Sequence, residues 1–260
     1  MQKPPVPPLS LQALHDFPMV TSDDDLASLL IASLEKNDIV LQTNDVLVMA
    51  QKIVSKAEGR LVRLCDVTPS PRAHEVAQVT GKDPRMIELI LSESQDVIAL
   101  RPDLIIVEHR LGYIMANAGV DQSNIEHPDG EECALLLPLD PDGTCAQLKA
   151  ALDAHFNADV AVLINDSFGR PWRQGITGVA LGAAGLPSLV SLIDKPDLYG
   201  RAMRVSEIAF ADELAAAASL LMGQTDAAKP VVHVRGLTWD AANNNPARTL
   251  LRPKKQDLFR

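Results

Sequence analysis

Two short apolar runs constrain the fold of this chain more than any other feature. They are VLVMA at Val46–Ala50 and DVAVLI at 159–164. Apolar runs of this length, bounded by turn residues, indicate buried strands. Segments with helical periodicity alternate with them along the chain, which indicates an α/β class with α+β character. The expected architecture is a set of mixed β-sheets with flanking helices.

Periodicity and capping residues locate the helices. We expect helices at 26–36, 72–80, 84–94, 144–156 and 206–222, short strands between 96 and 115, and a late strand at 231–234. Tight turns are indicated by HPDG at 127–130, by DPDG at 140–143, and by Gly169, Gly175, Gly178, Gly182 and Gly185. No internal repeat or long linker divides the chain. We therefore expect one domain over 1–260, with two interleaved subdomains as the alternative.

The net charge excludes several classes of partner. The 34 acidic and 24 basic side chains give a formal charge of −10, which disfavours binding to nucleic acid or to an anionic membrane. No window approaches the roughly 18 apolar residues of a transmembrane helix, and the proline-rich start, MQKPPVPPLS, lacks the apolar region of a signal peptide. The 3 cysteines have no CxxC spacing. We expect a cytoplasmic protein.

The first candidate site follows the apolar residues 113–116. Asp121 and Asn124 stand close together in GVDQSN, so their oxygens can serve one hard cation. The alternative is an Asx-turn, in which the two side chains bond only their own backbone. The residues leave both interpretations open.

The second candidate, NDSFGRPWR at 165–173, comes directly after the second apolar run. Acidic residues at the carboxyl end of a buried strand point into the crevice where α/β proteins bind ligands. Asp166 and Ser167 offer adjacent carboxylate and hydroxyl oxygens to a metal, and Arg170 and Arg173 suit a phosphate or carboxylate. In the alternative, Asp166 and Ser167 cap a helix while the arginines pair with surface acids.

Two further segments place polar residues beside predicted buried elements. Lys52 and Lys56 follow Val46–Ala50, where a lysine can meet a phosphate, although solvated lysines are far commoner. The chain has no GxxxxGK[ST] motif, so this segment is not a P-loop. The segment MGQTD at 222–226 ends the last predicted helix. Gly223 alone can account for the termination of this helix. In the other interpretation, a polar loop at this position closes over a nucleotide.

Six ordered motifs resemble the coenzyme F-420-0:gamma-glutamyl ligase family. They are VSKxEGR at 54–60, AGVDxSN at 118–124, LPxDPD at 137–142, DSxGRxWR at 166–173, DLYG at 197–200, and ADELA at 211–215 leading into MGQ at 222–224. Each motif is short, but together the matches run in order from about Phe17 to Val234, nearly the whole chain. The resemblance implies a ligase fold without a P-loop.

The family's enzymes use GTP and divalent metal to add L-glutamate through gamma-linkages to the deazaflavin precursor F-420-0. The resemblance implies two Mg²⁺ or Mn²⁺ sites, with K⁺ as a further ion, held by Asp121, Asp166, Ser167 and Gln224. Ser167 stands where the family usually has Thr and keeps the hydroxyl. GTP is assigned to residues 16–19 near the N-terminus, to Gln51, Lys56 and Asn124, and to the loop 222–229. The nucleotide-binding set is thus Phe17, Pro18, Gln51, Lys56, Asn124, Met222, Gly223, Gln224, Thr225 and Asp226.

Amide formation requires that a carboxylate be activated. The route implied by the resemblance is phosphoryl transfer from GTP to the substrate carboxylate, which gives an acyl phosphate that the amine of glutamate displaces. Asp121 and Asp166 act here as metal ligands, and Arg170 and Arg173 are candidates for an anionic substrate carboxylate on motif position and chemistry. Ala50-Gln51 stand where the family often has Thr-Ser, which removes a hydroxyl expected near the nucleotide.

The resemblance also implies a homodimer and, at this length, no C-terminal reductase domain of the kind that some relatives carry. Two alternatives stand beside the ligase. One is a related enzyme that joins an amino acid to a different carboxylate, and the other is a non-catalytic deazaflavin or nucleotide binder. The set of Asp121, Asn124 and Asp166 argues against the binder, because binding alone does not need a metal site.

Overall fold

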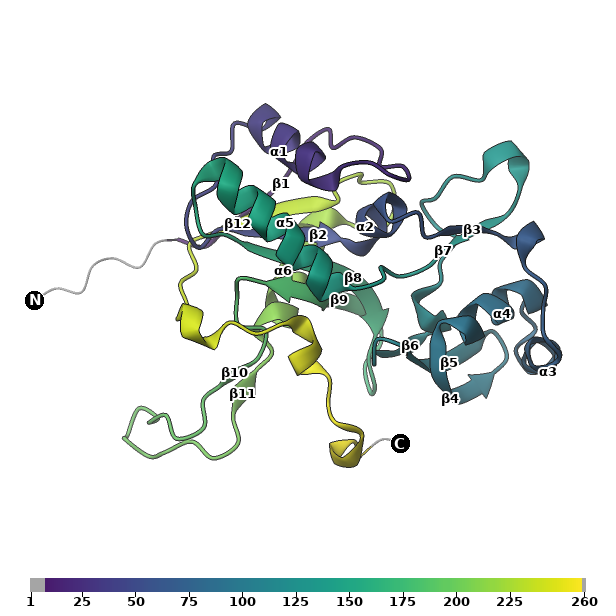
Figure 1. Ribbon diagram of the computed structural model, residues 1–260. Helices are drawn as coiled ribbons and strands as arrows, with labels where there is room; N and C mark the ends of the chain where they lie inside the picture. The colour runs from purple at the N-terminus through teal and green to yellow at the C-terminus, as the bar shows by residue number, and fades with distance from the viewer. Residues whose placement is uncertain (1–7, 259–260) are drawn as a thin grey trace, which may run out of the picture.

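The computed structural model describes residues 8–258 of the protein (Figure 1). Residues 1–7 of the proline-rich start lie outside this range. The strands are β1 (Ser10–Ala13), β2 (Val46–Ala50), β3 (Leu61–Arg63), β4 (Ser94–Arg101), β5 (Leu104–His109), β6 (Ile114–Ala116), β7 (Cys133–Leu135), β8 (Ala161–Gly169), β9 (Ile176–Ala184), β10 (Val190–Ser191), β11 (Glu207–Ile208) and β12 (Val231–Arg235). The helices are α1 (Leu26–Lys36), α2 (Gln51–Ala57), α3 (Pro71–Thr80), α4 (Pro84–Ser92), α5 (Pro141–Phe156) and α6 (Phe210–Met222).

The two predicted buried strands lie side by side in the central sheet. The strand order is β1-β12-β2-β8-β9, in which β2 and β8 run parallel and the other neighbours run antiparallel. Parallel strands end at the same edge of a sheet, and here Ala50 of β2 pairs with Asn165 of β8. The predicted α/β class with mixed sheets and flanking helices is confirmed.

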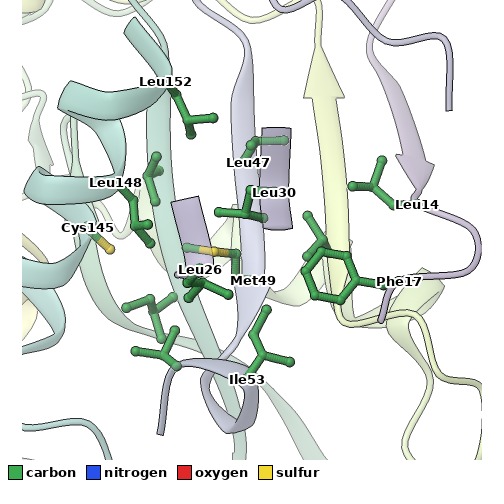
Figure 2. Close-up of a cluster of buried hydrophobic side chains, with 14 of the residues drawn as sticks. Leu14, Phe17, Leu26, Leu30, Leu47, Met49, Ile53, Cys145, Leu148 and Leu152 are labelled. Atoms are coloured by element: carbon green, nitrogen blue, oxygen red, sulfur yellow. The ribbon is translucent and has the colours of Figure 1, made fainter. Parts of the chain in front are cut away.

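Helices cover both faces of this sheet, which explains why β2 has no polar positions. On one face, α1 and α5 pack against β2 in the cluster that Figure 2 shows, whose members include Leu30, Leu47, Met49, Leu148 and Leu152. On the other face, α6 packs small side chains against the sheet, among them Ala211, Ala215 and Ala218. The side chain of Asp25 caps α1 by accepting hydrogen bonds from the backbone N–H groups of Ala27 and Ser28.

The prediction that Gly178 and Gly182 form turns is wrong, because both lie inside strand β9. A Cβ on Gly178 would lie 2.3 Å from the carbonyl oxygen of Ala215 in α6. A Cβ on Gly182 would lie 2.4 Å from the backbone of Pro141 in α5. These glycines therefore let two helices approach the opposite faces of one strand. Gly175 and Gly185, just outside β9, do have the positive φ of turn residues (81° and 82°).

Two helices begin several residues away from the positions that the sequence predicts. Helix α5 begins at Pro141, because Asp140 caps it through a hydrogen bond from the Gly143 N–H at 3.1 Å, so DPDG starts a helix and is not a free turn. Helix α6 begins at Phe210, because Glu207–Ile208 pairs with Val190–Ser191 in a two-stranded ribbon.

A third hydrophobic cluster lies beside the central sheet and is formed mainly by α3, α4 and the strands β3, β4, β5 and β7 (Figure 1). Glu93, next to α4, links this cluster to the region after α2, because its carboxylate pairs with Arg60 at 2.8 Å and with Arg110 at 3.0 Å. Burial alone would raise the pKa of Glu93, but bonds from His109, Arg110 and Arg60 outweigh it and hold the pKa at about 2. Within residues 8–258, no helix is long and apolar enough to cross a membrane.

Candidate functional site

A cavity of about 430 Å³ lies where β2 ends, beside the last half of β8. Five separate parts of the chain line it. They are residues 17–20 after β1, 50–53 and Lys56 in α2, 124–126, 165–167 in β8, and 222–230 after α6. This edge of the parallel strand pair is where α/β proteins bind ligands.

Asp166 and Ser167 reach the cavity from inside a strand. The sequence predicts that the strand ends at these residues, but β8 continues to Gly169 and pairs Asp166 with Val179 in β9. The helix-cap alternative for Asp166 and Ser167 is therefore wrong. A register shift separates Ile164 from Asn165 in this ladder. The buried Asn165 supports the irregularity, because its Oδ1 accepts a hydrogen bond from the Val179 N–H at 3.1 Å.

Three of the four predicted metal ligands come together on this wall. The Ser167 hydroxyl donates a hydrogen bond to the Gln224 side-chain oxygen at 2.9 Å, which joins β8 to the loop after α6. Burial raises the pKa of Asp166 to about 6, and a hydrogen bond from the Ser167 backbone and the charge of Lys52 only partly oppose this. A partly buried carboxylate of this kind gains from a nearby cation.

Asp121 lies in the loop after β6 and faces Lys52. Its backbone pairs with Leu135 in both directions, at 3.1 Å and 2.8 Å, which fixes the loop. Its Oδ1 accepts a hydrogen bond from the Ser123 N–H at 2.9 Å, so the expected Asx-turn is present. Its Oδ2 accepts a hydrogen bond from the Lys52 ammonium group. The Asp121 side chain therefore bonds to more than its local backbone, unlike in the Asx-turn interpretation. Burial raises the pKa of Asp121, but the bonds from Lys52 and Ser123 outweigh it and lower the pKa overall.

The oxygens of this wall, together with the Asp121 carboxylate that pairs with Lys52 and does not itself line the cavity, suit a hard divalent cation. Asp121 and Asp166 affect each other, because the charge of Asp121 raises the pKa of Asp166. Among residues 8–258, no three His, Cys, Asp or Glu side chains form a metal-binding group. A cation would thus combine the two carboxylates with neutral oxygens such as those of Ser167 and Gln224, or with oxygens of a substrate. All are oxygen ligands of the kind that Mg²⁺ and Mn²⁺ prefer.

The residues assigned to the nucleotide all line the cavity. They are Phe17, Pro18, Gln51, Lys56, Asn124, Met222, Gly223, Gln224, Thr225 and Asp226. Gln51 is buried and its side-chain oxygen accepts a hydrogen bond from the Ser55 hydroxyl at 2.8 Å. Burial lowers the pKa of Lys56, and the neighbouring charge of Lys52 lowers it further. Three ammonium groups, those of Lys52, Lys56 and Lys229, therefore share this cavity with exposed polar side chains of the loop after α6.

Arg170 and Arg173 lie elsewhere. Both are exposed in the hairpin between β8 and β9 and are not among the residues that line the cavity. The cavity is also lined by Lys52, which the sequence suggested only as a possible phosphate partner, and by Asn165 and Glu126, for which it predicted no role. Lys52 had a detectable signal, because it precedes Lys56 by one helical turn, and residues four apart share a helix face.

Fold and cavity together define the class of protein. It is an α/β protein that gathers carboxylates, ammonium groups and apolar side chains around a cavity the size of a small molecule, as enzymes with charged small-molecule substrates do. A sequence model of the family described as F420-0:Gamma-glutamyl ligase matches residues 15–236. The chain belongs to this family, and it is a ligase.

Several relatives match along nearly their whole length. A protein named coenzyme F420:L-glutamate ligase from Methanothermobacter thermautotrophicus is 43% identical over 253 residues, which cover 97% of this chain and 99% of the relative. The protein of the same name from Methanopyrus kandleri is 42% identical over 98% of this chain and 99% of the relative. That from Archaeoglobus fulgidus is 37% identical over 95% and 94%. The family resemblance read from six short motifs is thus confirmed.

Proposed function

We propose that this ligase adds L-glutamate by gamma-linkage to coenzyme F420-0, with GTP as the phosphate donor and two divalent cations, Mg²⁺ or Mn²⁺, as cofactors. The names of the relatives support glutamate ligation in coenzyme F420 biosynthesis. The observation that carries the nucleotide and metal parts is the single cavity. It collects three lysines, the Asp166–Ser167–Gln224 wall and the loop after α6 from distant parts of the chain.

The proposed chemistry needs a carboxylate to become an electrophile. GTP transfers its terminal phosphoryl group to the acceptor carboxylate, which forms an acyl phosphate and GDP. The amine of glutamate then attacks the acyl carbon, the amide bond forms and inorganic phosphate leaves. Bound divalent cations would supply neutralisation of the phosphate charge, which is the main catalytic requirement of phosphoryl transfer.

The chain's own residues hold and orient the reactants. Asp121 and Asp166 are fixed by a backbone pair and by a strand, so their carboxylates keep their places as substrates enter. Lys56 offers an ammonium group to the phosphates. Phe17, Ile53 and Met222 give the cavity an apolar wall that suits a flat ring. We further propose a homodimer, which light scattering on the purified protein tests, and K⁺ as an additional ion.

The direct test is a ligation assay. The protein is incubated with GTP, Mg²⁺ or Mn²⁺, L-glutamate and F420-0, and products are measured by mass spectrometry together with GDP. Mass increments of one glutamate support the proposal. GDP release only with another carboxylate acceptor would instead identify the related ligase, and binding of GTP without any GDP release would refute both.

A matched pair of variants tests the site. Asp121→Ala should lower turnover by about 100-fold or more, because even indirect partners of metal ligands contribute 10- to 100-fold. Asp66→Ala removes an exposed carboxylate outside the cavity and should leave turnover unchanged. Wild-type turnover in a folded Asp121→Ala protein would refute the assignment.

A further inference from the structure

The ammonium group of Lys52 already contacts the oxygens that a metal at Asp121 would use. It donates to Oδ2 of Asp121, to the Ser123 carbonyl oxygen at 2.8 Å and to the Ser123 hydroxyl at 3.0 Å. A carboxylate, a carbonyl and a hydroxyl are the kinds of oxygen that surround hard cations in proteins. Lys52 thus holds a protein-borne cation in an oxygen-lined position.

A divalent cation cannot join this arrangement unchanged. At the Asp121 carboxylate it would stand within a few ångströms of the Lys52 ammonium, and like charges at such a separation repel strongly in a partly buried place. The ammonium is carried on a flexible four-carbon stem, and Lys52 also lines the cavity. It can therefore leave Asp121 without a change of the backbone.

The cavity offers the displaced ammonium a second position. Lys52 and Lys56 lie one turn apart on α2, and the charge of Lys52 lowers the pKa of Lys56, so the two face the same space. The two ammonium groups repel each other, and the charge of Glu126 offsets this only in part at Lys56. A polyphosphate in the cavity would pair with both.

We propose that Lys52 is an exchangeable internal cation, which neutralises Asp121 until a divalent ion takes that carboxylate and then pairs with the phosphates of the nucleotide. This inference rests on the proposed function, because it takes Asp121 as a metal ligand. It makes metal binding weak in the absence of nucleotide and stronger in its presence. Lys52 thereby couples the two binding events.

A permanent ion pair is the competing interpretation. In that case Lys52 only anchors the loop 121–124, and its removal loosens Asp121 and weakens metal binding. The exchange model predicts the opposite sign, because removal of a competitor strengthens metal binding. The direction of the change in Mn²⁺ affinity therefore separates the two.

The experiment is a Mn²⁺ titration of the full chain without nucleotide, followed by the loss of the free Mn²⁺ signal in electron paramagnetic resonance. Lys52→Met should bind Mn²⁺ about tenfold more tightly than the wild type, a difference of about 1.4 kcal/mol. Lys52→Arg keeps the charge and should bind as the wild type does. Lys36→Met, which removes an exposed ammonium paired with Asp16, should also have no effect.

Two additions keep the outcome clear. Lys52→Gln is measured beside Lys52→Met, and circular dichroism checks that both are folded. Equal or weaker Mn²⁺ binding by the folded variants overturns the inference. With GTP present the difference from the wild type should shrink, because the wild-type lysine then has phosphate partners, and a difference that stays constant also overturns it. Tighter Mn²⁺ binding without any ligation of glutamate would instead refute the proposed function and leave the exchange intact.

Discussion

The buried carboxylate of Asp45, just before β2, gives the sharpest test of how this fold is held together. It is 1% exposed and accepts hydrogen bonds from Arg235 at 2.8 Å and 2.6 Å. The His233 Nε2 lies 2.9 Å away. Both partners belong to β12, so this cluster fixes β12 against the start of β2, and β2 leads directly into Lys52 and Lys56.

The magnitude follows from the pKa of Asp45. Burial would raise this pKa, but bonds from Arg235, His233 and the Gln42 backbone outweigh it and lower the pKa from 3.8 to about 2. A difference of nearly two units at 1.36 kcal/mol each gives about 2 kcal/mol of stability. A lowered carboxyl pKa stabilises the fold fully above pH 3.8 and stops doing so as the pH falls through about 2.

Asp45→Asn should therefore lower the free energy of unfolding at pH 7 by about 2 kcal/mol or more. Urea unfolding at pH 7 and pH 3 measures this. At pH 3 the difference from the wild type should be smaller by about 1 kcal/mol, because the Asp45 carboxyl of the unfolded wild type is then mostly protonated while that of the folded protein is still mostly ionised. The control Asp38→Asn changes an exposed carboxylate and should stay within about 0.5 kcal/mol. An equal difference at both pH values would refute the reasoning.

Three further predictions concern the site and its support. Gly178→Ala should lower the free energy of unfolding by about 1–3 kcal/mol, because its Cβ would meet the Ala215 carbonyl oxygen at 2.3 Å, and an unchanged urea midpoint would contradict this. Asp166→Asn should raise the free energy of unfolding in EDTA by about 1–3 kcal/mol, because it removes a carboxylate whose pKa burial raises to about 6. The same change should weaken Mn²⁺ binding. A destabilised variant would count against the assignment. Ser167→Ala should lower the rate of ligation, because the hydroxyl that bonds to Gln224 is lost. Ser167→Thr keeps a hydroxyl and should retain the rate. Equal rates for the two variants would show that the hydroxyl is dispensable.

The sequence predicted the elements whose boundaries depend on local chemistry. Helix Leu26–Lys36 and strand Val46–Ala50 have the expected bounds, because a capping carboxylate and flanking turn residues define them. The length of β8 depends on pairing with β9, which periodicity cannot detect. Gly178 was misassigned for the same reason, since only the position of α6 explains why no side chain fits there.

The sequence predicted which residues belong to the site better than it predicted which of them contact each other. Motif order identified residues that line one cavity, although they lie as far apart as Phe17 and Asp226. The pairing of Lys52 with Asp121 joins residues 69 positions apart, and no local pattern records such a contact. The charge of Arg170 and Arg173 suggested a role at the site, but side-chain chemistry alone does not give their location. Both lie in the hairpin after β8, and this position decides what they can contact.

The charge of the chain can now be compared with the charge of the cavity. A net −10 should repel the proposed substrates, which are GTP, glutamate and an anionic acceptor, from the surface as a whole. The cavity lining is different, because the three lysines Lys52, Lys56 and Lys229 face the three acids Glu126, Asp166 and Asp226. This balance is locally neutral, so the cavity does not share the overall repulsion. Each divalent cation would add two positive charges to the cavity. Displacement of Lys52 from Asp121 would direct one more positive charge, that of its ammonium group, toward the phosphates. Metal and nucleotide should therefore each strengthen the binding of the other, and the acidic surplus elsewhere keeps this attraction confined to the cavity.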